Sequence, residues 1–285
     1  PSHRAHGRET DRAGAVGESR GTPDRPEFKG DLDLQDLFYA GWNLGKGKAT
    51  VDLRDKILSV RFDVQSGLGG FLGEARLLTE PGYPGRATVE FRDWDVRKII
   101  ASSAPALLDD FSTALHGSLV IEGSFGELSR LKYRGEMDGA RFKIHGYEFR
   151  NDGMMRFSGD NQKLVVEDAR LVGRGSSLAL EKNGVFPLEA DGALNLHLAG
   201  RLDLGFLDHL AAKAGVSGAA IIDVNITGSQ RAPEVLGRAA LEDTRVNYED
   251  LPYPLSALRG NIVFSRNSIK LENVTGAIAS GTIQL

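Results

Sequence analysis

The chain has 285 residues, 41 % of them hydrophobic, so it is long enough to bury a sizeable core. Its net charge of −4 gives no basic field for a nucleic acid, and its lack of cysteine excludes disulfides, thiolate metal sites and a cysteine nucleophile. Glycine is the unusual component, with 35 residues, which favours many short strands joined by turns.

The first residues, 1–27, contain almost no large apolar side chain and many Arg, Gly, Asp and Glu residues. Such a segment cannot offset the entropy of its own ordering, so we expect a disordered lead-in. The chain has no initiator Met, no signal peptide and no apolar run of about 18 residues, and it stops within the strand-like "GTIQL". We therefore expect a piece of a longer protein whose membrane anchor lies outside these residues.

Beyond Phe28 apolar residues alternate with polar ones, which is typical of half-buried strands. Clear examples are "ATVEF" (87–91), "KLVVED" (163–168), "ALNLHLAG" (193–200), "AIIDVNITG" (220–228) and "NIVF" (261–264). The apolar positions that we expect to line one face are Val89, Phe91, Leu164, Val166, Leu194, Leu196, Leu198, Ile222, Val224, Ile226, Ile262 and Phe264.

Three stretches show helical spacing after an aspartate that can cap the first turn. They are 34–42 after Asp33, 94–115 after Asp93, and 204–215 after Asp203. Pro105 should break the middle one in two. We predict short capped helices that pack against a sheet.

The glycine-rich segment "SGLGGFLGEARL" (66–77) resembles a phosphate-binding loop in composition only. Gly67, Gly69 and Gly73 are spaced one residue too far for the dinucleotide fingerprint, and no Lys-Ser or Lys-Thr follows. We expect these glycines to bend strands or form bulges, because a missing Cβ lets a sheet curl.

Residues with catalytic or metal-binding chemistry are scattered, so we predict no enzyme, no catalytic residue, no metal site and no cofactor. The histidines, His116, His145, His197 and His209, form no ligand spacing, and His197 falls on the polar side of its strand. The acidic pairs Asp93/Asp95 and Asp109/Asp110 suggest a cap and solvated charges rather than glycosidase carboxylates, and Ser176 and Ser177 lack the G-x-S-x-G context of a nucleophile.

Landmarks recur at an offset of 105 residues. Gly123-Ser124 and Gly228-Ser229 each close a strand. Residues 166–180 align in sequence with residues 271–285, with their apolar positions mostly in register. Residues 66–77 align by eye with 275–285 as a third copy. Repeats of this length suggest a stacked β architecture.

The closing segment, 237–285, resembles the recurring unit of the AsmA/TamB family of bacterial envelope proteins. The resemblance rests on a Gly-led strand, an apolar-polar strand, a "P-L-S-x-L-x-G" link at 254–260, and two strands that end in a Gly-rich bend. The resemblance extends over about 28–285 and is strongest in the last fifty residues.

The resemblance implies a mostly β fold: an elongated, twisted, repeating β-sheet groove with short capped helices between units. We expect a first partial unit at 28–86, a second at 87–190 and a third, truncated at its end, at 191–285. It also implies a periplasmic protein, anchored in the inner membrane by a segment outside this chain, that guides phospholipids to the outer membrane.

Under this interpretation the apolar alternation described above lines the groove, and a charge at Val224 or Leu196 should abolish lipid binding without unfolding the chain. Implied partners are phospholipids and an Omp85-type outer-membrane protein, with no nucleic acid. Two alternatives stay open: a non-enzymatic β-solenoid scaffold or adhesin with a sealed core, and a factor for outer-membrane protein assembly that conducts no lipid.

Overall fold

The computed structural model describes residues 12–22, 25–39, 42–97, 111–144, 146–189, 191–205 and 214–284. The described residues form 18 strands, which pair antiparallel with their neighbours. The predicted class, a mostly β fold, is confirmed. The chain divides into two compact units, Pro1–Asp95 with Ser118–Leu131, and Val96–Gly117 with Lys132–Leu285.

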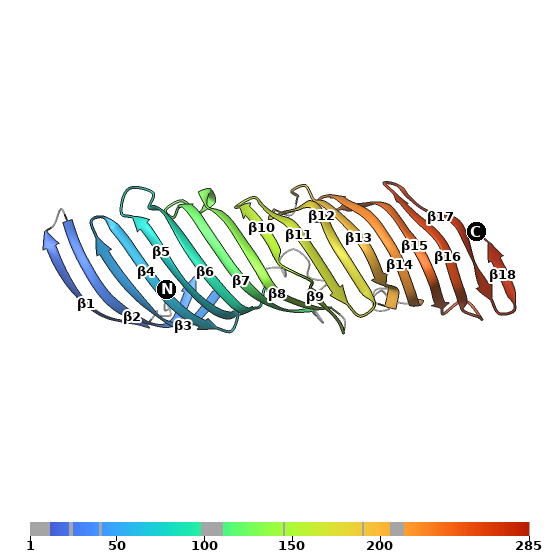
Figure 1. Ribbon diagram of the computed structural model, residues 1–285, viewed down its shortest axis with the longest axis horizontal. Helices are drawn as coiled ribbons and strands as arrows, with labels where there is room; N and C mark the ends of the chain where they lie inside the picture. The colour runs from blue at the N-terminus through green and yellow to red at the C-terminus, as the bar shows by residue number, and fades with distance from the viewer. Residues whose placement is uncertain are drawn as a thin grey trace, which may run out of the picture. The chain divides into compact units, whose positions relative to one another are not determined.

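The first unit is a run of antiparallel hairpins in chain order (Figure 1). Its strands are β1 (Arg12–Thr22), β2 (Arg25–Tyr39), β3 (Trp42–Arg54), β4 (Ile57–Ser66), β5 (Gly69–Leu78) and β6 (Pro84–Trp94). From β3 to β6 the pairing continues without a register shift. Burial alternates residue by residue from Val60 to the end of β4 and from Phe71 to the end of β5, as the period of two in their sequences requires.

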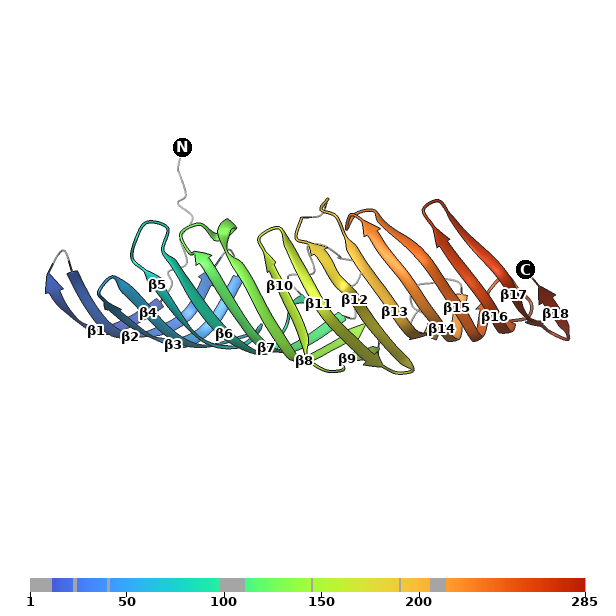
Figure 2. The same cartoon turned by 45° about the horizontal axis from the view of Figure 1, so that its top comes forward.

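Strand β7 (Phe111–Ser124) contributes to both units, and the 3-10 turn η2 (Leu128–Arg130) belongs to the first. The remaining strands lie in the second unit: β8 (Lys132–Ile144), β9 (Tyr147–Asn151), β10 (Met155–Asp160), β11 (Lys163–Gly173), β12 (Ser176–Pro187), β13 (Asn195–Asp203), β14 (Ala214–Gly228), β15 (Pro233–Tyr248), β16 (Leu255–Ser265), β17 (Ser268–Ile278) and β18 (Gly281–Gln284). From β10 to β18 each strand pairs with the next, and both views show β11 to β17 side by side (Figures 1 and 2). β8 pairs with both β9 and β10.

Strands of the second unit are interrupted by bulges. The register shifts within the ladders β11/β12, β12/β13, β14/β15, β15/β16 and β16/β17. Asn183, Asp243, Ala257 and Asn273 have positive φ angles at or beside these shifts. A bulge inserts an unpaired residue and bends its strand, so these strands do not run straight.

The structure corrects two expectations about local structure. Residues 12–22, expected to be disordered, form strand β1, which pairs along its length with β2. The expected helix at 34–42 is wrong, because β2 extends to Tyr39 and β3 begins at Trp42. The pairing of β2 with β3 shifts twice between Leu34 and Phe38. Because of these shifts the apolar residues no longer recur at every second position, and their spacing imitates that of a helix.

The other two expected helices lie largely outside the described residues. Of the stretch 94–115, residues from Phe111 onward belong to strand β7, so a helix is wrong there, and residues 98–110 are outside the described part. Val96 N donates a hydrogen bond to Thr113 Oγ over 2.9 Å, which ties the two ends of this stretch together. Of the stretch 204–215, residues 206–213 are outside the described part.

The offset of 105 residues corresponds to one structural element. The hairpin β11/β12 turns at 174–175, and β17/β18 turns at 279–280, so both strands and turns of the two pairs match at this offset. Segment 66–77 also contains a hairpin, but its turn lies at 67–68, whereas residues 275–278 are still inside β17. The expected units 28–86, 87–190 and 191–285 do not coincide with the two compact units and stay a prediction.

Candidate functional site

One face of the sheet in the first unit is apolar from strand to strand. Facing pairs such as Val51 with Val60, and Phe71 with Phe91, stand on it, because paired residues of antiparallel strands project to the same side. Its residues are Phe28, Gly30, Leu32 and Leu34 on β2; Gly47, Ala49, Val51 and Leu53 on β3; Leu58, Val60, Phe62 and Val64 on β4; Phe71, Gly73, Ala75 and Leu77 on β5; and Gly85, Ala87, Val89 and Phe91 on β6. We call this the first apolar face.

Large side chains of the first apolar face lie over glycines of the neighbouring strand. The ring of Phe62 comes within 2.7 Å of the position that a Cβ on Gly73 would take, and Leu77 Cδ2 comes within 2.6 Å of that position on Gly85. These glycines are recesses that the neighbouring side chains fill. Trp94 closes one end, edge-on to Phe91 and Phe71 with ring centroids 5.1 and 6.0 Å away.

The second unit has an equivalent face across β11 to β17. Facing pairs include Leu198 with Val224, Ile222 with Ala239, and Ala239 with Ile262. Its residues are Leu164, Val166, Ala169 and Leu171 on β11; Leu178, Leu180, Gly184 and Phe186 on β12; Leu196, Leu198, Gly200 and Leu202 on β13; Ala220, Ile222, Val224 and Ile226 on β14; Val235, Gly237, Ala239 and Leu241 on β15; Leu258, Gly260, Ile262 and Phe264 on β16; and Ile269, Leu271 and Val274 on β17. We call this the second apolar face.

The predicted lining residues divide by burial. Phe91, Val166, Leu196 and Val224 are buried. Val89, Leu164, Leu194, Leu198, Ile222, Ile226, Ile262 and Phe264 are partly exposed. The alternation of apolar and polar residues in the sequence thus indicates which face of the sheet a side chain occupies, but not how deeply it is buried.

The bulges of β14 to β17 meet at a buried corner of the second apolar face. Thr244, Val274 and Leu258 are 2 %, 2 % and 5 % exposed. The Thr244 hydroxyl donates a hydrogen bond to the carbonyl oxygen of Ala219 over 3.2 Å, which satisfies the one polar side chain of the three. The strands therefore bend where their apolar side chains are packed most closely.

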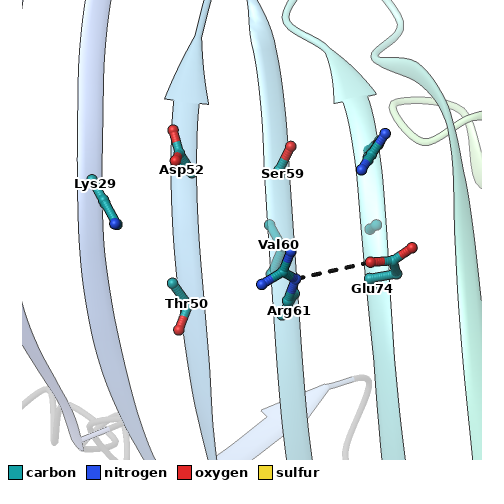
Figure 3. Close-up of a pocket in the computed structure, with 9 residues that line it drawn as sticks. Lys29, Thr50, Asp52, Ser59, Val60, Arg61 and Glu74 are labelled. Atoms are coloured by element: carbon teal, nitrogen blue, oxygen red, sulfur yellow. Dashed lines mark ion pairs between the residues drawn. The ribbon is translucent and has the colours of Figure 1, made fainter.

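The opposite faces carry the charged residues. In the first unit, Lys29, Asp52, Arg61 and Glu74 line a shallow pocket of about 290 Å³, where Arg61 and Glu74 form an exposed ion pair with an N–O distance of 3.9 Å (Figure 3). Exposed ion pairs contribute at most about 1 kcal/mol each. Both signs of charge alternate here, so this face suits solvent rather than one charged ligand.

His197 lies on the polar side of its strand, as expected, but its ring is held between two carboxylates. Its Nε2 is 2.9 Å from Asp223 Oδ1, and its Nδ1 is 3.6 Å from Glu181 Oε2. The ring therefore bridges β12, β13 and β14. Arg201 and Glu242 form a further ion pair on the same face.

The other reactive side chains considered from the sequence are placed apart. Ser176 is buried, and its hydroxyl accepts a hydrogen bond from Asp203 N over 2.9 Å. Asp93 has a positive φ of 51° at the end of β6. His145, His209, Asp109 and Asp110 lie outside the described residues. Within the described part of the chain, no group of three His, Asp or Glu residues has metal-binding geometry.

Two titratable groups at the β10/β11 turn are shifted. Backbone hydrogen bonds from Gln162 and Lys163 lower the pKa of Asp160 below its usual 3.8. Burial, and then the charge of Asp160, raise the pKa of Tyr133, whose ring lies over Gly159. Tyr133 thus stays a neutral donor to the carbonyl oxygen of Lys163, at 3.3 Å.

Sequence reasoning missed most of the first apolar face. Only Val89 and Phe91 were expected there, whereas Val60, Phe62 and Val64 of β4 share it. The signal is present in "LSVRFDVQ" (58–65), which alternates without interruption. In the neighbouring strands β3 and β5, some positions of the apolar face are glycine or alanine, so the alternation of large apolar and polar residues is harder to recognise.

Comparisons with known proteins give no relative: no family model, no curated protein and no solved structure matches the chain. The described residues also include no helix that is long and apolar enough to cross a bilayer.

Proposed function

We propose that the two apolar faces form grooves that bind the acyl chains of phospholipids. The observation that carries this proposal is the second apolar face, on which every position named above is Gly, Ala or a larger apolar residue and most of the large side chains are only partly buried. An acyl chain that leaves water for such a surface gains about 0.8 kcal/mol for each buried CH₂ group.

The dimensions of the second apolar face suit this ligand. Six strand intervals of about 4.8 Å separate β11 from β17, or about 29 Å in total. One leaflet of a bilayer with a ~30 Å hydrocarbon core holds an acyl chain over roughly 15 Å. A whole acyl chain therefore fits within the second apolar face.

The bulges support a groove rather than a flat sheet. They bend β14 to β17 at one level. The most buried side chains at that level are Leu258 and Val274, which stand on the second apolar face, and Thr244, which pairs with Leu258. Side chains on the inner side of a bend are crowded, so we infer that the apolar face lies inside it.

The resemblance to the AsmA/TamB family adds the biological setting of the proposal. In that setting the chain is a segment of a periplasmic protein, anchored to the inner membrane outside these residues, which guides phospholipid toward the outer membrane. An Omp85-type outer-membrane protein is the proposed protein partner. A groove of this kind transfers lipid without covalent chemistry, so we propose no enzymatic activity.

A pair of neighbouring isoleucines gives a matched test. Ile222 stands on the second apolar face, and Ile221, 41 % exposed, stands on the opposite face of the same strand. The full chain is incubated with phosphatidylethanolamine and phosphatidylglycerol vesicles, and the lipid that remains with the protein after gel filtration is measured. We expect Ile222→Glu to lose most of the bound lipid and Ile221→Glu to retain it, with unchanged circular dichroism for both.

Val224 and Leu196, chosen from the sequence, are poorer positions for this test. Both are buried, so a glutamate there would lose its hydration and destabilise the fold as well as the proposed site. Equal lipid retention by Ile221→Glu and Ile222→Glu, or no lipid on the wild-type chain, would contradict the proposal. The second result would favour a sealed scaffold.

A further inference from the structure

Leu204, the residue that follows β13, packs on the second apolar face. Asp203 N donates a hydrogen bond to Ser176 Oγ over 2.9 Å, and Gly205 N donates to Asp203 Oδ1 over 2.8 Å. These two bonds end the strand and turn the chain at Leu204. Gly175 allows the approach, because a Cβ there would lie 2.9 Å from the Asp203 carboxylate.

Leu204 fills a depression in the second apolar face. It is 7 % exposed and forms a buried cluster with Ala220 and Ala239, which are 1 % and 7 % exposed. Larger residues surround this cluster; they are Val216, Ile222, Leu241, Ile262 and Phe264. The two alanines form a low floor between larger side chains, and the Leu204 side chain occupies the space above it.

We infer that Leu204 is a plug that occupies the place of an acyl chain on β14 and β15 and so determines where along the face a lipid chain can lie. This inference rests on the proposed function. With Leu204 in place, acyl chains contact residues on either side, such as the partly exposed Leu198 and the exposed Leu271, and not Ala220 or Ala239.

Photocrosslinking tests the plug directly. The full chain is loaded with palmitate that carries a diazirine in mid-chain, irradiated, and digested, and the modified residues are mapped by mass spectrometry. We expect wild-type adducts on the second apolar face but none on Ala220 or Ala239. Leu204→Ala should gain adducts at both alanines, and Leu204→Met, which keeps a side chain of similar volume, should keep the wild-type pattern.

The outcomes separate the plug from the groove. Adducts on Ala220 or Ala239 of the wild-type chain would overturn the plug and leave lipid binding intact, as would a Leu204→Ala chain of unchanged circular dichroism whose adducts do not change. Adducts on neither apolar face of the wild-type chain would overturn the proposed function itself. If Leu204→Ala does not fold, Leu204→Val removes less packing, and adducts gained at the alanines in that variant support the plug, whereas an unchanged pattern overturns it.

Discussion

The two apolar faces are built from the same alternation but differ in regularity. In the first unit β3 to β6 pair without a register shift, and its large apolar side chains lie over glycines of the next strand. In the second unit the ladders of β14 to β17 shift, and Thr244, Leu258 and Val274 are almost fully buried at the bend. Regular pairing leaves most large side chains of the first apolar face half-exposed, with Phe91, which packs against Trp94, as the buried exception. In the second unit the bulges gather part of the apolar surface into a core.

This difference separates the residues that stabilise the fold from those available to bind an apolar ligand. A half-exposed face contributes little packing to the fold but remains available to an apolar ligand. A bulged corner contributes packing and fixes the curvature. We therefore expect substitutions at the corner to affect unfolding, and substitutions on the half-exposed positions to affect lipid retention.

The largest expected effect compares two leucines. Leu258, 5 % exposed at the corner, should lose about 2 to 5 kcal/mol of unfolding free energy on substitution by alanine. Leu58, half-buried on the first apolar face, should lose about 1 kcal/mol on the same change, because it gives up less buried area. Urea unfolding followed by circular dichroism measures the unfolding free energy of both variants. Equal losses would contradict the stated difference between the corner and the half-exposed face.

A smaller effect compares two glycines. Gly237 in β15 has φ +134°, and a Cβ there would lie only 2.2 Å from the Asp223 carbonyl oxygen. Gly237→Ala should therefore cost at least about 2 kcal/mol. Gly67, in the turn of β4/β5, has no atom within 4 Å of its Cβ position, so Gly67→Ala should be neutral or gain up to about 1 kcal/mol.

Thermal unfolding of the two glycine variants sharpens the difference between a regular hairpin and a bulged ladder. A destabilised Gly67→Ala would show that the first unit depends on a glycine there after all. A stable Gly237→Ala would show that the second unit can shift its strands by more than this geometry allows.

The smallest effect concerns the turn between β10 and β11. Because the pKa of Asp160 is lowered in the folded chain, its carboxylate stabilises the fold above its usual pKa of 3.8, and this contribution is lost as the pH falls through the lowered value. The group is exposed, so Asp160→Asn should cost well under about 1 kcal/mol at pH 7. In urea titrations the difference between variant and wild type should shrink as the pH falls below 3.8 and close once the pH lies below the lowered pKa of Asp160. A difference that stays constant over that range would contradict this assignment.

The sequence predicts the apolar faces well where polar residues alternate with Leu, Ile and Val, as in β13 and β14. It does not predict bulges, because an inserted residue changes the period from two to three and imitates a helix, as between Leu34 and Phe38. It also does not predict which lining residues are deeply packed. Val224 and Ile222 have the same pattern, yet the first is buried and the second is partly exposed.

The lead-in shows another limit of sequence reasoning. Strand β1 has almost no apolar residue to bury, and Val16 is 82 % exposed. Its pairing with β2 satisfies backbone hydrogen bonds and lays Gly17 under the ring of Phe28, and composition reports neither. The plug residue Leu204 was expected within a helix, and its contact with Ala220 and Ala239 depends on the turn at Asp203.

The central claim is that the apolar faces are open to acyl chains, and native mass spectrometry of the purified full chain tests it most directly. We expect phospholipid to remain bound in near-stoichiometric amount, to be identified after organic extraction, and to be lost from Ile222→Glu but not from Ile221→Glu. A folded wild-type chain that carries no lipid, and takes up none from vesicles, would contradict the claim and identify these faces as sealed.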